Sequence, residues 1–137
     1  MKIEPIEAHY RGKAKDNGEW LYGSLLYNPR LNRAFILPTA LWPVDDYAVD
    51  PQSVGMFTGR IDKTGESIFC GDIIRNDFGN IGLVYWNKNR LALCVDYGKL
   101  GITSLANENI DSKGLLKAQV LGNIHDPNNL WKEPENE

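Results

Sequence analysis

The chain has 137 residues, of which 42% are hydrophobic and 24% charged, a composition that excludes a disordered or fibrous protein and fits one globular domain. A net charge of -3, with no basic block along the chain, argues against a nucleic-acid partner, because acidic side chains repel a phosphate backbone. Two cysteines, no apolar leader and no bilayer-length apolar run exclude a disulfide scaffold and predict a cytoplasmic protein without a membrane contact.

Glycines and prolines punctuate the chain at short intervals, and the stretches between them are rich in β-branched and aromatic residues. This pattern predicts a series of short strands. In chain order the expected strands cover residues 6–11, 20–27, 33–37, 53–58, 67–70, 72–75, 81–86, 91–97, 100–105 and 115–121. The three strands between residues 72 and 97 are expected to form a meander.

The connections between these strands carry their own signals. The Asn-Gly pair at residues 17–18 favours a tight hairpin turn, and residues 62–65 (DKTG) are typical turn chemistry before another strand. Residues 42–52 hold two prolines and three aspartates without a strand or helix period, so we expect a loop there. The Asp-Pro pair at residues 126–127 predicts one helical turn, because an N-cap residue precedes a proline.

Together these elements predict a single domain over residues 1–132, followed by a polar tail at 133–137. Strand signals that recur every 8–12 residues or so are typical of a small barrel or sandwich. The expected fold is therefore mainly β, a small SH3-like or partly open β-barrel with an N-terminal β-hairpin extension and little helix.

Four ordered segments carry a resemblance to a known family, and four segments with consistent spacing are more specific than one short motif. In chain order they are an opening, an approach, a core motif and an ending: 10–13 (YRGK) with 18–23 (GEWLYG), 49–55 (VDPQSVG) with 57–59 (FTG), 62–74 (DKTGESIFCGDII), and 121–126 (LGNIHD). On these segments the chain is identified as a member of the YopX family, small proteins encoded by phages and prophages.

The resemblance implies a compact, largely β fold that self-associates, in a phage-derived gene whose biochemical role is not established, and it supplies no catalytic residue. Three features depart from the family pattern. Met56 stands where the family usually has Gln, Cys70 where it usually has Glu, and residues 129–131 replace a more aliphatic ending. If those polar family positions bind a ligand, we expect this chain to bind it differently.

Two glycine-rich patterns resemble ligand loops without meeting their requirements. A phosphate loop needs four residues between its glycines and a lysine after the second, but five residues separate Gly59 from Gly65, and Glu66 follows. A calcium loop needs several oxygen ligands before its glycine, and residues 62–65 supply one carboxylate. Glycines in a β turn are the more probable origin of both patterns.

Metal and thiol chemistry find equally little support. Cys70, Cys94, His9 and His125 contain the ligand types of a zinc site, but each is isolated, without the short paired spacing that preorganises such a site. A cysteine nucleophile needs a nearby base to lower its thiol pKa, and none stands next to Cys70. We therefore expect the cysteines to pack as small apolar side chains.

Paired carboxylates are the remaining catalytic candidates. Asp45, Asp46 and Asp50 cluster in the expected loop, while Glu66 and Asp72 flank one expected hairpin. Two carboxyl groups at a suitable separation perform acid and base catalysis in hydrolases. Solvated loop charges and capping groups are the commoner role of such residues, so we expect no catalytic residue, no cofactor and no metal.

Nucleic-acid binding is the main alternative to a protein partner, because small barrels often present aromatic and basic side chains on one sheet face. Trp86, Lys88 and Arg90, with Tyr85 and Tyr97 nearby, would suit such a face. Aromatic residues in a β meander are more often core, and the net charge opposes binding, so this partner is possible but not favoured.

The expected role is a non-enzymatic binding or assembly module of prophage origin, either a homo-oligomer or a partner of an unknown phage or host protein. A β fold whose strand edges must be covered or paired supports this expectation. Arg11, Trp20 and the segment from Gly59 to Asp72 are the first places to look for function. As parts of the family signature, their glycines also suggest backbone constraint.

Overall fold

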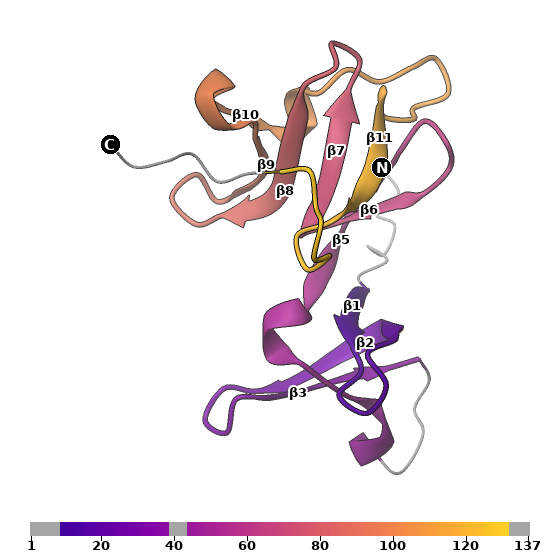
Figure 1. Cartoon of the computed structure of the whole chain (residues 1–137), viewed down its shortest axis with the longest axis vertical. Helices are drawn as coiled ribbons and strands as arrows, with labels where there is room; N and C mark the ends of the chain where they lie inside the picture. Colours follow the sequence, from indigo (N-terminus) through magenta and orange to yellow (C-terminus); the bar gives the residue numbers. More distant parts are fainter. Residues whose placement is uncertain (1–8, 39–43, 132–137) are drawn as a thin grey trace, which may run out of the picture. The chain divides into compact units, whose positions relative to one another are not determined.

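The computed structural model describes residues 9–38 and 44–131. The chain divides into two compact units, Met1–Phe57 and Thr58–Glu137 (Figure 1). A single domain over residues 1–132 stays a prediction, because two compact units can still unfold in one cooperative step. The expected polar tail at 133–137 and the first three residues of the expected strand 6–11 lie outside the described residues.

The first unit is an antiparallel arrangement in the order β4-β3-β2-β1-β5. Its strands are β1 (Tyr10–Lys13), β2 (Trp20–Asn28), β3 (Arg33–Leu37), β4 (Ala48–Val49) and the start of β5 (Gly55–Ile61). The N-terminal hairpin β1–β2 is confirmed. Its turn is wider than a two-residue turn, because only Gly18 of the Asn-Gly pair has a positive φ, 71°, and the hairpin closes by a bond from Ala14 N to Glu19 O.

The loop expected at residues 42–52 was wrong within its described part, 44–52. Two single turns of 3-10 helix, η1 (Val44–Tyr47) and η2 (Pro51–Ser53), flank β4 there. The reason is burial: Val49 is fully buried and packs with Ala34 and Ile36 in the core of this unit. Elements of two to four residues are too short to show a period in the sequence.

The second unit contains a five-stranded antiparallel sheet in the order β10-β9-β8-β7-β11 (Figure 1). Its strands are β7 (Asp72–Asn76), β8 (Ile81–Asn87), β9 (Ala92–Asp96), β10 (Ile102–Ser104) and β11 (Ala118–Asn123). The expected meander is thereby confirmed as β7–β8–β9. The remainder of β5 and β6 (Ser67–Phe69) belong to the same unit.

Three expectations for the second unit need adjustment. The strand expected at residues 100–105 is only three residues long, because η3 (Gly98–Leu100) and η4 (Leu105–Asn107) flank β10. The strand expected at 115–121 begins and ends later, as β11. The helical turn expected at residues 126–127 is a non-helical turn, closed by a bond from Asn129 N to Asp126 O at 3.3 Å.

Strand alternation places the core of the second unit on one face of its sheet. Its buried members are apolar and come from the sheet and the segments next to it: Ile68, Ile74, Val84, Val95, Leu105, Leu116 and Ala118. The mainly β class with little helix is confirmed, and no closed barrel forms among the described residues, consistent with a small β-rich fold. None of the helical segments in the described part of the chain is long and apolar enough to cross a membrane.

Candidate functional site

The turn at residues 62–65, within the core family motif, is organised by one buried carboxylate. Asp62 is fully buried, and its Oδ1 accepts bonds from Thr64 N at 2.8 Å, Thr64 Oγ1 at 2.7 Å and Glu66 N at 2.9 Å. Its Oδ2 accepts a bond from Val120 N on β11 at 2.9 Å. The carboxylate therefore fixes both the turn and the strand that lies beside it.

The protonation of Asp62 fits this structural role. Burial raises the pKa of its carboxyl group, but four hydrogen bonds to the charged form, from Val120, Thr64 and Glu66, lower the pKa below its ordinary value overall. The group is therefore ionised at neutral pH. Both oxygens already accept bonds from the protein, so the turn chemistry predicted for residues 62–65 is confirmed.

The core motif and the ending motif are joined by backbone bonds. Gly71 O accepts a bond from Ile124 N at 2.8 Å, and the Asp126 carboxylate accepts one from Asn123 N at 3.0 Å. Gly122 lies so close that an added Cβ would stand 2.7 Å from Asp126 Oδ2. Two segments of the family signature, about fifty residues apart, thus hold each other in place.

The carboxylates considered for hydrolysis do not form one pair. Asp50 caps η2 by accepting a bond from Gln52 N at 3.0 Å, and Asp45 lies 3.9 Å from the Arg33 guanidinium. In the second unit Glu66 is exposed, whereas Asp72 is buried and accepts a bond from Phe69 N at 2.8 Å. The bonds that the structure shows for these groups are those of caps and turns.

The thiol and imidazole side chains are also placed by packing. Cys94 is fully buried in β9, Cys70 is half-buried after β6, and the His9 ring stacks on Phe57 with centroids 4.5 Å apart. Within residues 9–38 and 44–131, no group of three or more His, Cys, Asp or Glu side chains could hold a metal ion.

Arg11 and Trp20, singled out by the family opening, lie together on one face of the first unit. The Arg11 guanidinium stands 4.7 Å from the Trp20 ring centroid and the Lys13 ammonium 5.6 Å from it. Such cation–π contacts stabilise a sheet surface. Met56, one of the departures from the family pattern, pairs with Tyr10 between β5 and β1.

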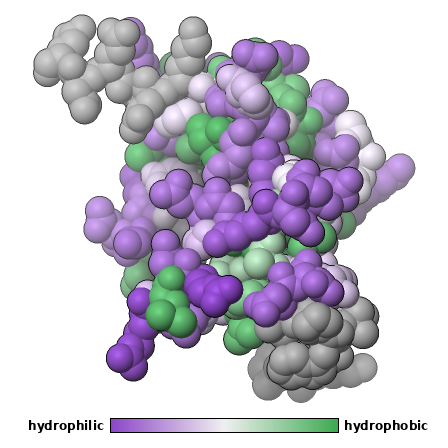
Figure 2. Space-filling model, turned by 60° about the horizontal axis from the view of Figure 1, so that its bottom comes forward, coloured by the Kyte–Doolittle hydropathy of each residue, from purple (hydrophilic) through white to green (hydrophobic). Residues whose placement is uncertain are grey.

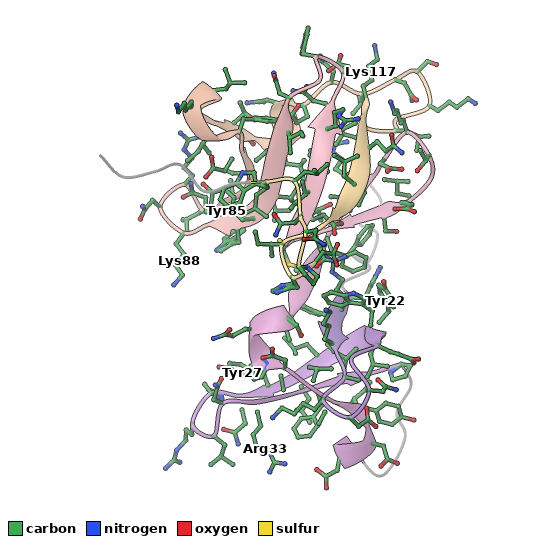
Figure 3. All side chains as sticks on the ribbon, in the orientation of Figure 1. Tyr22, Tyr27, Arg33, Tyr85, Lys88 and Lys117 are labelled. Carbon is green, nitrogen blue, oxygen red and sulfur yellow. The ribbon has the colours of Figure 1, made fainter. Side chains whose placement is uncertain are left out.

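The structure does not assemble the nucleic-acid surface considered above. Val84 and Trp86 alternate with Tyr85 along β8, so Trp86 lies on the core face and Tyr85 on the opposite face. Tyr97 packs against the core and donates a bond to Glu108. In Figure 3, Lys88 and Lys117 lie at opposite ends of the second unit.

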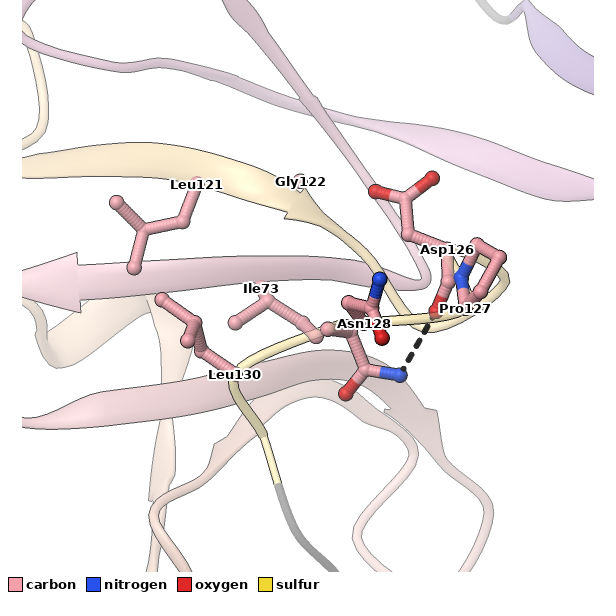
Figure 4. A pocket seen from close by; sticks show the side chains of 8 residues that line it. Ile73, Leu121, Gly122, Asp126, Pro127, Asn128 and Leu130 are labelled. Carbon is pink, nitrogen blue, oxygen red and sulfur yellow. Dashed lines mark hydrogen bonds between the residues drawn. The ribbon is translucent and has the colours of Figure 1, made fainter.

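The second face of the five-stranded sheet carries a small pocket beside the C-terminal segment. It has a volume of about 300 Å³, and Ile73, Leu121 and Leu130 gather at one end of it, while Asp126 lies at the other (Figure 4). A bond from Asn129 Nδ2 to Asp126 O at 3.2 Å crosses the pocket rim. The pocket is small and lies among residues that pack the chain's own end against the sheet.

Exposed apolar side chains mark a larger hollow in the same unit. On the face drawn in Figure 2, hydrophobic side chains form small patches in a mostly hydrophilic surface. Phe78, Leu100 and Ile102 are 76%, 68% and 39% exposed, and all three line one groove of about 540 Å³. This β10 groove is lined by Asn76, Phe78, Asn80, Arg90, Tyr97, Leu100, Ile102, Thr103, Ser104, Asn107, Glu108 and Asn109.

The β10 groove includes an open edge of the sheet. On its inner side β10 pairs with β9, and no other strand in the described part of the chain pairs with it. The edge at β11 is different, because Leu116 N donates to Ile61 O at 2.8 Å and Lys63 N donates to Ala118 O at 3.1 Å. The β10 edge is thus the one that the chain leaves available.

Polar groups frame the apolar residues of the groove. Glu108 accepts bonds from Tyr97 Oη at 2.7 Å and Thr103 Oγ1 at 3.0 Å, both through Oε1. Burial and the bond to Glu108 raise the pKa of Tyr97 well above its ordinary value, so its hydroxyl stays a donor. Arg90 donates to Ile102 O at 3.3 Å, on the edge of β10. An apolar centre with a polar rim is the usual anatomy of a protein-binding surface.

Comparison with known proteins gives one match. The model of the family described as YopX protein matches residues 9–132, nearly the whole chain. No curated protein matches the sequence. The matched range includes all four segments on which the resemblance was based.

Proposed function

Since the chain belongs to the YopX family, and the signature residues described above hold the fold together, we propose that it is a non-enzymatic binding module that recognises protein through its β10 groove. The observation that carries this proposal is the exposure of Phe78, Leu100 and Ile102 beside an open strand edge. Contiguous exposed apolar groups are uncommon on soluble proteins except at interaction sites.

The physical form of the groove suits an extended peptide segment. A strand that pairs with an exposed sheet edge gains backbone hydrogen bonds, and side-chain pockets beside the edge give specificity. Both parts are present here, since β10 offers the backbone and Phe78 and Leu100 offer apolar contacts. A phage-derived gene and action in the bacterial cytoplasm are parts of the same proposal.

The binding proposal is tested by selecting random displayed peptides against the full chain. Peptides selected by the wild type should bind Phe78→Ser at least about tenfold more weakly, the loss that corresponds to about 1.4 kcal/mol. Leu31→Ser is the matched control, because Leu31 is 65% exposed in the turn between β2 and β3, outside the groove. Failure to select any peptide, or equal binding by both variants, contradicts the proposal.

A further inference from the structure

We propose that the occupant of the β10 groove is a second copy of this chain, with β10 pairing antiparallel to β10 of its partner about a two-fold axis at Thr103. This inference rests on the proposed function of the groove and names its partner. Isologous pairing is the commonest way in which soluble proteins form dimers. Three observations favour it: the direction of the backbone groups of β10, its apolar neighbours and its charges.

The backbone of β10 turns the groups of alternate residues outward. Tyr97 N donates to Gly101 O at 2.9 Å, so this pair is of the hydrogen-bonded type. Hydrogen-bonded and non-bonded pairs alternate along an antiparallel ladder, and the register places Thr103 opposite Val95 and Ile102 opposite Asp96. Thr103 therefore bonds to β9, while Ile102 and Ser104 present their N–H and C=O groups to the open edge.

A two-fold axis at Thr103 satisfies these outward groups. It brings Ile102 of one copy opposite Ser104 of the other, and the reverse, so that each pair exchanges two backbone hydrogen bonds. In the single chain one of these groups, Ile102 O, is instead covered by Arg90 at 3.3 Å. A cation over an exposed edge is a usual protection against uncontrolled pairing, and here an incoming strand would displace it.

The displaced arginine has a partner in the second copy. Glu108 lies beside Thr103, to which it is bonded through Oε1, and no described residue bonds to its Oε2 in the hydrogen bonds of residues 9–38 and 44–131. Because Arg90 and Glu108 both line the groove around Thr103, the two-fold axis brings Arg90 of each copy next to Glu108 of the other. The surface is therefore complementary to itself in charge as well as in backbone bonding.

The apolar residues complete the self-complementary surface. Leu100 and Ile102 lie at the start of β10, and Phe78 lies in the neighbouring turn between β7 and β8. Pairing places these exposed side chains against the partner's groove and removes them from water. The same contact would not form at β11, whose edge already bonds to residues 61–63.

The test uses light scattering of the full chain at micromolar concentration, with a matched pair of variants at Ser104. Ser104→Pro removes the outward N–H, and the φ of -74° at this residue suits proline, so the fold should be retained. Ser104→Ala keeps the N–H. We expect a dimer for the wild type and for Ser104→Ala, and a monomer for Ser104→Pro. A monomeric wild type, or a Ser104→Pro variant as dimeric as the wild type, overturns the proposal.

Charge reversal gives a second, independent test. Arg90→Glu and Glu108→Arg should each weaken dimerisation by about 10- to 100-fold, because like charges then meet across the axis. An equimolar mixture of the two should recover the dimer, since both cross-axis pairs are again opposite in charge. If circular dichroism shows both variants folded and the mixture stays monomeric, the Arg90–Glu108 pairing is refuted.

The outcomes also separate this inference from the proposed function. A monomeric wild type that still binds selected peptides through Phe78 overturns self-pairing and leaves the groove as a protein-binding site. A wild-type dimer that loses association in Ser104→Pro supports self-pairing, whatever peptides are selected. A protein with neither property overturns both.

Discussion

Replacing Asp62 with Asn tests whether the core motif of the family is structural. Asn can accept the three bonds that Oδ1 now accepts, but its amide NH₂ would then face the N–H of Val120, which Oδ2 binds at 2.9 Å. The substitution removes one bond to a charged group, worth about 1.5–3 kcal/mol, and leaves a buried donor unpaired. We expect the free energy of unfolding to fall by about 2–4 kcal/mol.

Asp111 supplies a matched control for this variant. It begins a turn of the same form, with Gly114 at the fourth place, and its Oδ1 accepts bonds from Lys113 N and Leu115 N. No bond to Asp111 Oδ2 is formed among the described residues, so Asp111→Asn should change the free energy of unfolding by less than about 0.5 kcal/mol. Asn76 already makes the same two bonds in the turn before β8.

Both variants are measured by urea unfolding, followed through tryptophan fluorescence. The pKa of Asp62 is lowered in the folded state, so its contribution is fully present above the ordinary value of 3.8 and is lost as pH falls through the folded pKa. The difference between wild type and Asp62→Asn should therefore be largest above pH 3.8 and shrink in stronger acid. Equal stability of wild type and Asp62→Asn at pH 7, or an equal loss in Asp111→Asn, would refute the reasoning.

Three further substitutions test individual features by the same unfolding measurement. Leu91→Gly should raise the free energy of unfolding by up to about 1 kcal/mol, because Leu91 has a left-handed φ of 51° and is 77% exposed; a loss of stability would contradict the strain. Gly122→Ala should lower it by about 1–3 kcal/mol, since φ is 152° and the new Cβ meets Asp126; an unchanged value would show that the turn yields. Trp131→Phe should cost about 1 kcal/mol, because the indole N–H donates to Asp96 O at 3.0 Å, and no loss would mean that this bond contributes nothing.

The strands that the sequence predicted well are those bounded by turn residues on both sides. Residues 33–37 form β3 as predicted, and residues 20–27 form all but the last residue of β2. Between residues 72 and 97, three apolar stretches separated by Asn- and Gly-rich turns give β7, β8 and β9. Local chemistry alone fixes such elements.

Features that depend on distant segments could not be predicted. The turn at residues 62–65 was recognised from its own residues, but the bond from Val120 to Asp62 spans 58 positions. Likewise, Phe78 and Leu100 have no signal that would place them on one groove, which forms only when β7, β8 and β10 join the same sheet. The division into two compact units also arises from packing that no local pattern reports.

One expectation could have been rejected from the sequence itself. Tyr85 and Trp86 are consecutive residues of a predicted strand, and consecutive side chains point to opposite faces of a sheet. They could not belong to one flat binding surface together. By contrast, the open edge of β10 required the pairing register, because a three-residue strand has no period of its own.

Backbone amide exchange, measured residue by residue at several protein concentrations, decides whether β10 is the binding edge. If β10 pairs between copies, the amides of Ile102 and Ser104 become slower to exchange as concentration rises, while that of Thr103, bonded to β9, stays protected throughout. Exchange of Ile102 and Ser104 that remains equally fast at every concentration at which the protein associates would contradict the account.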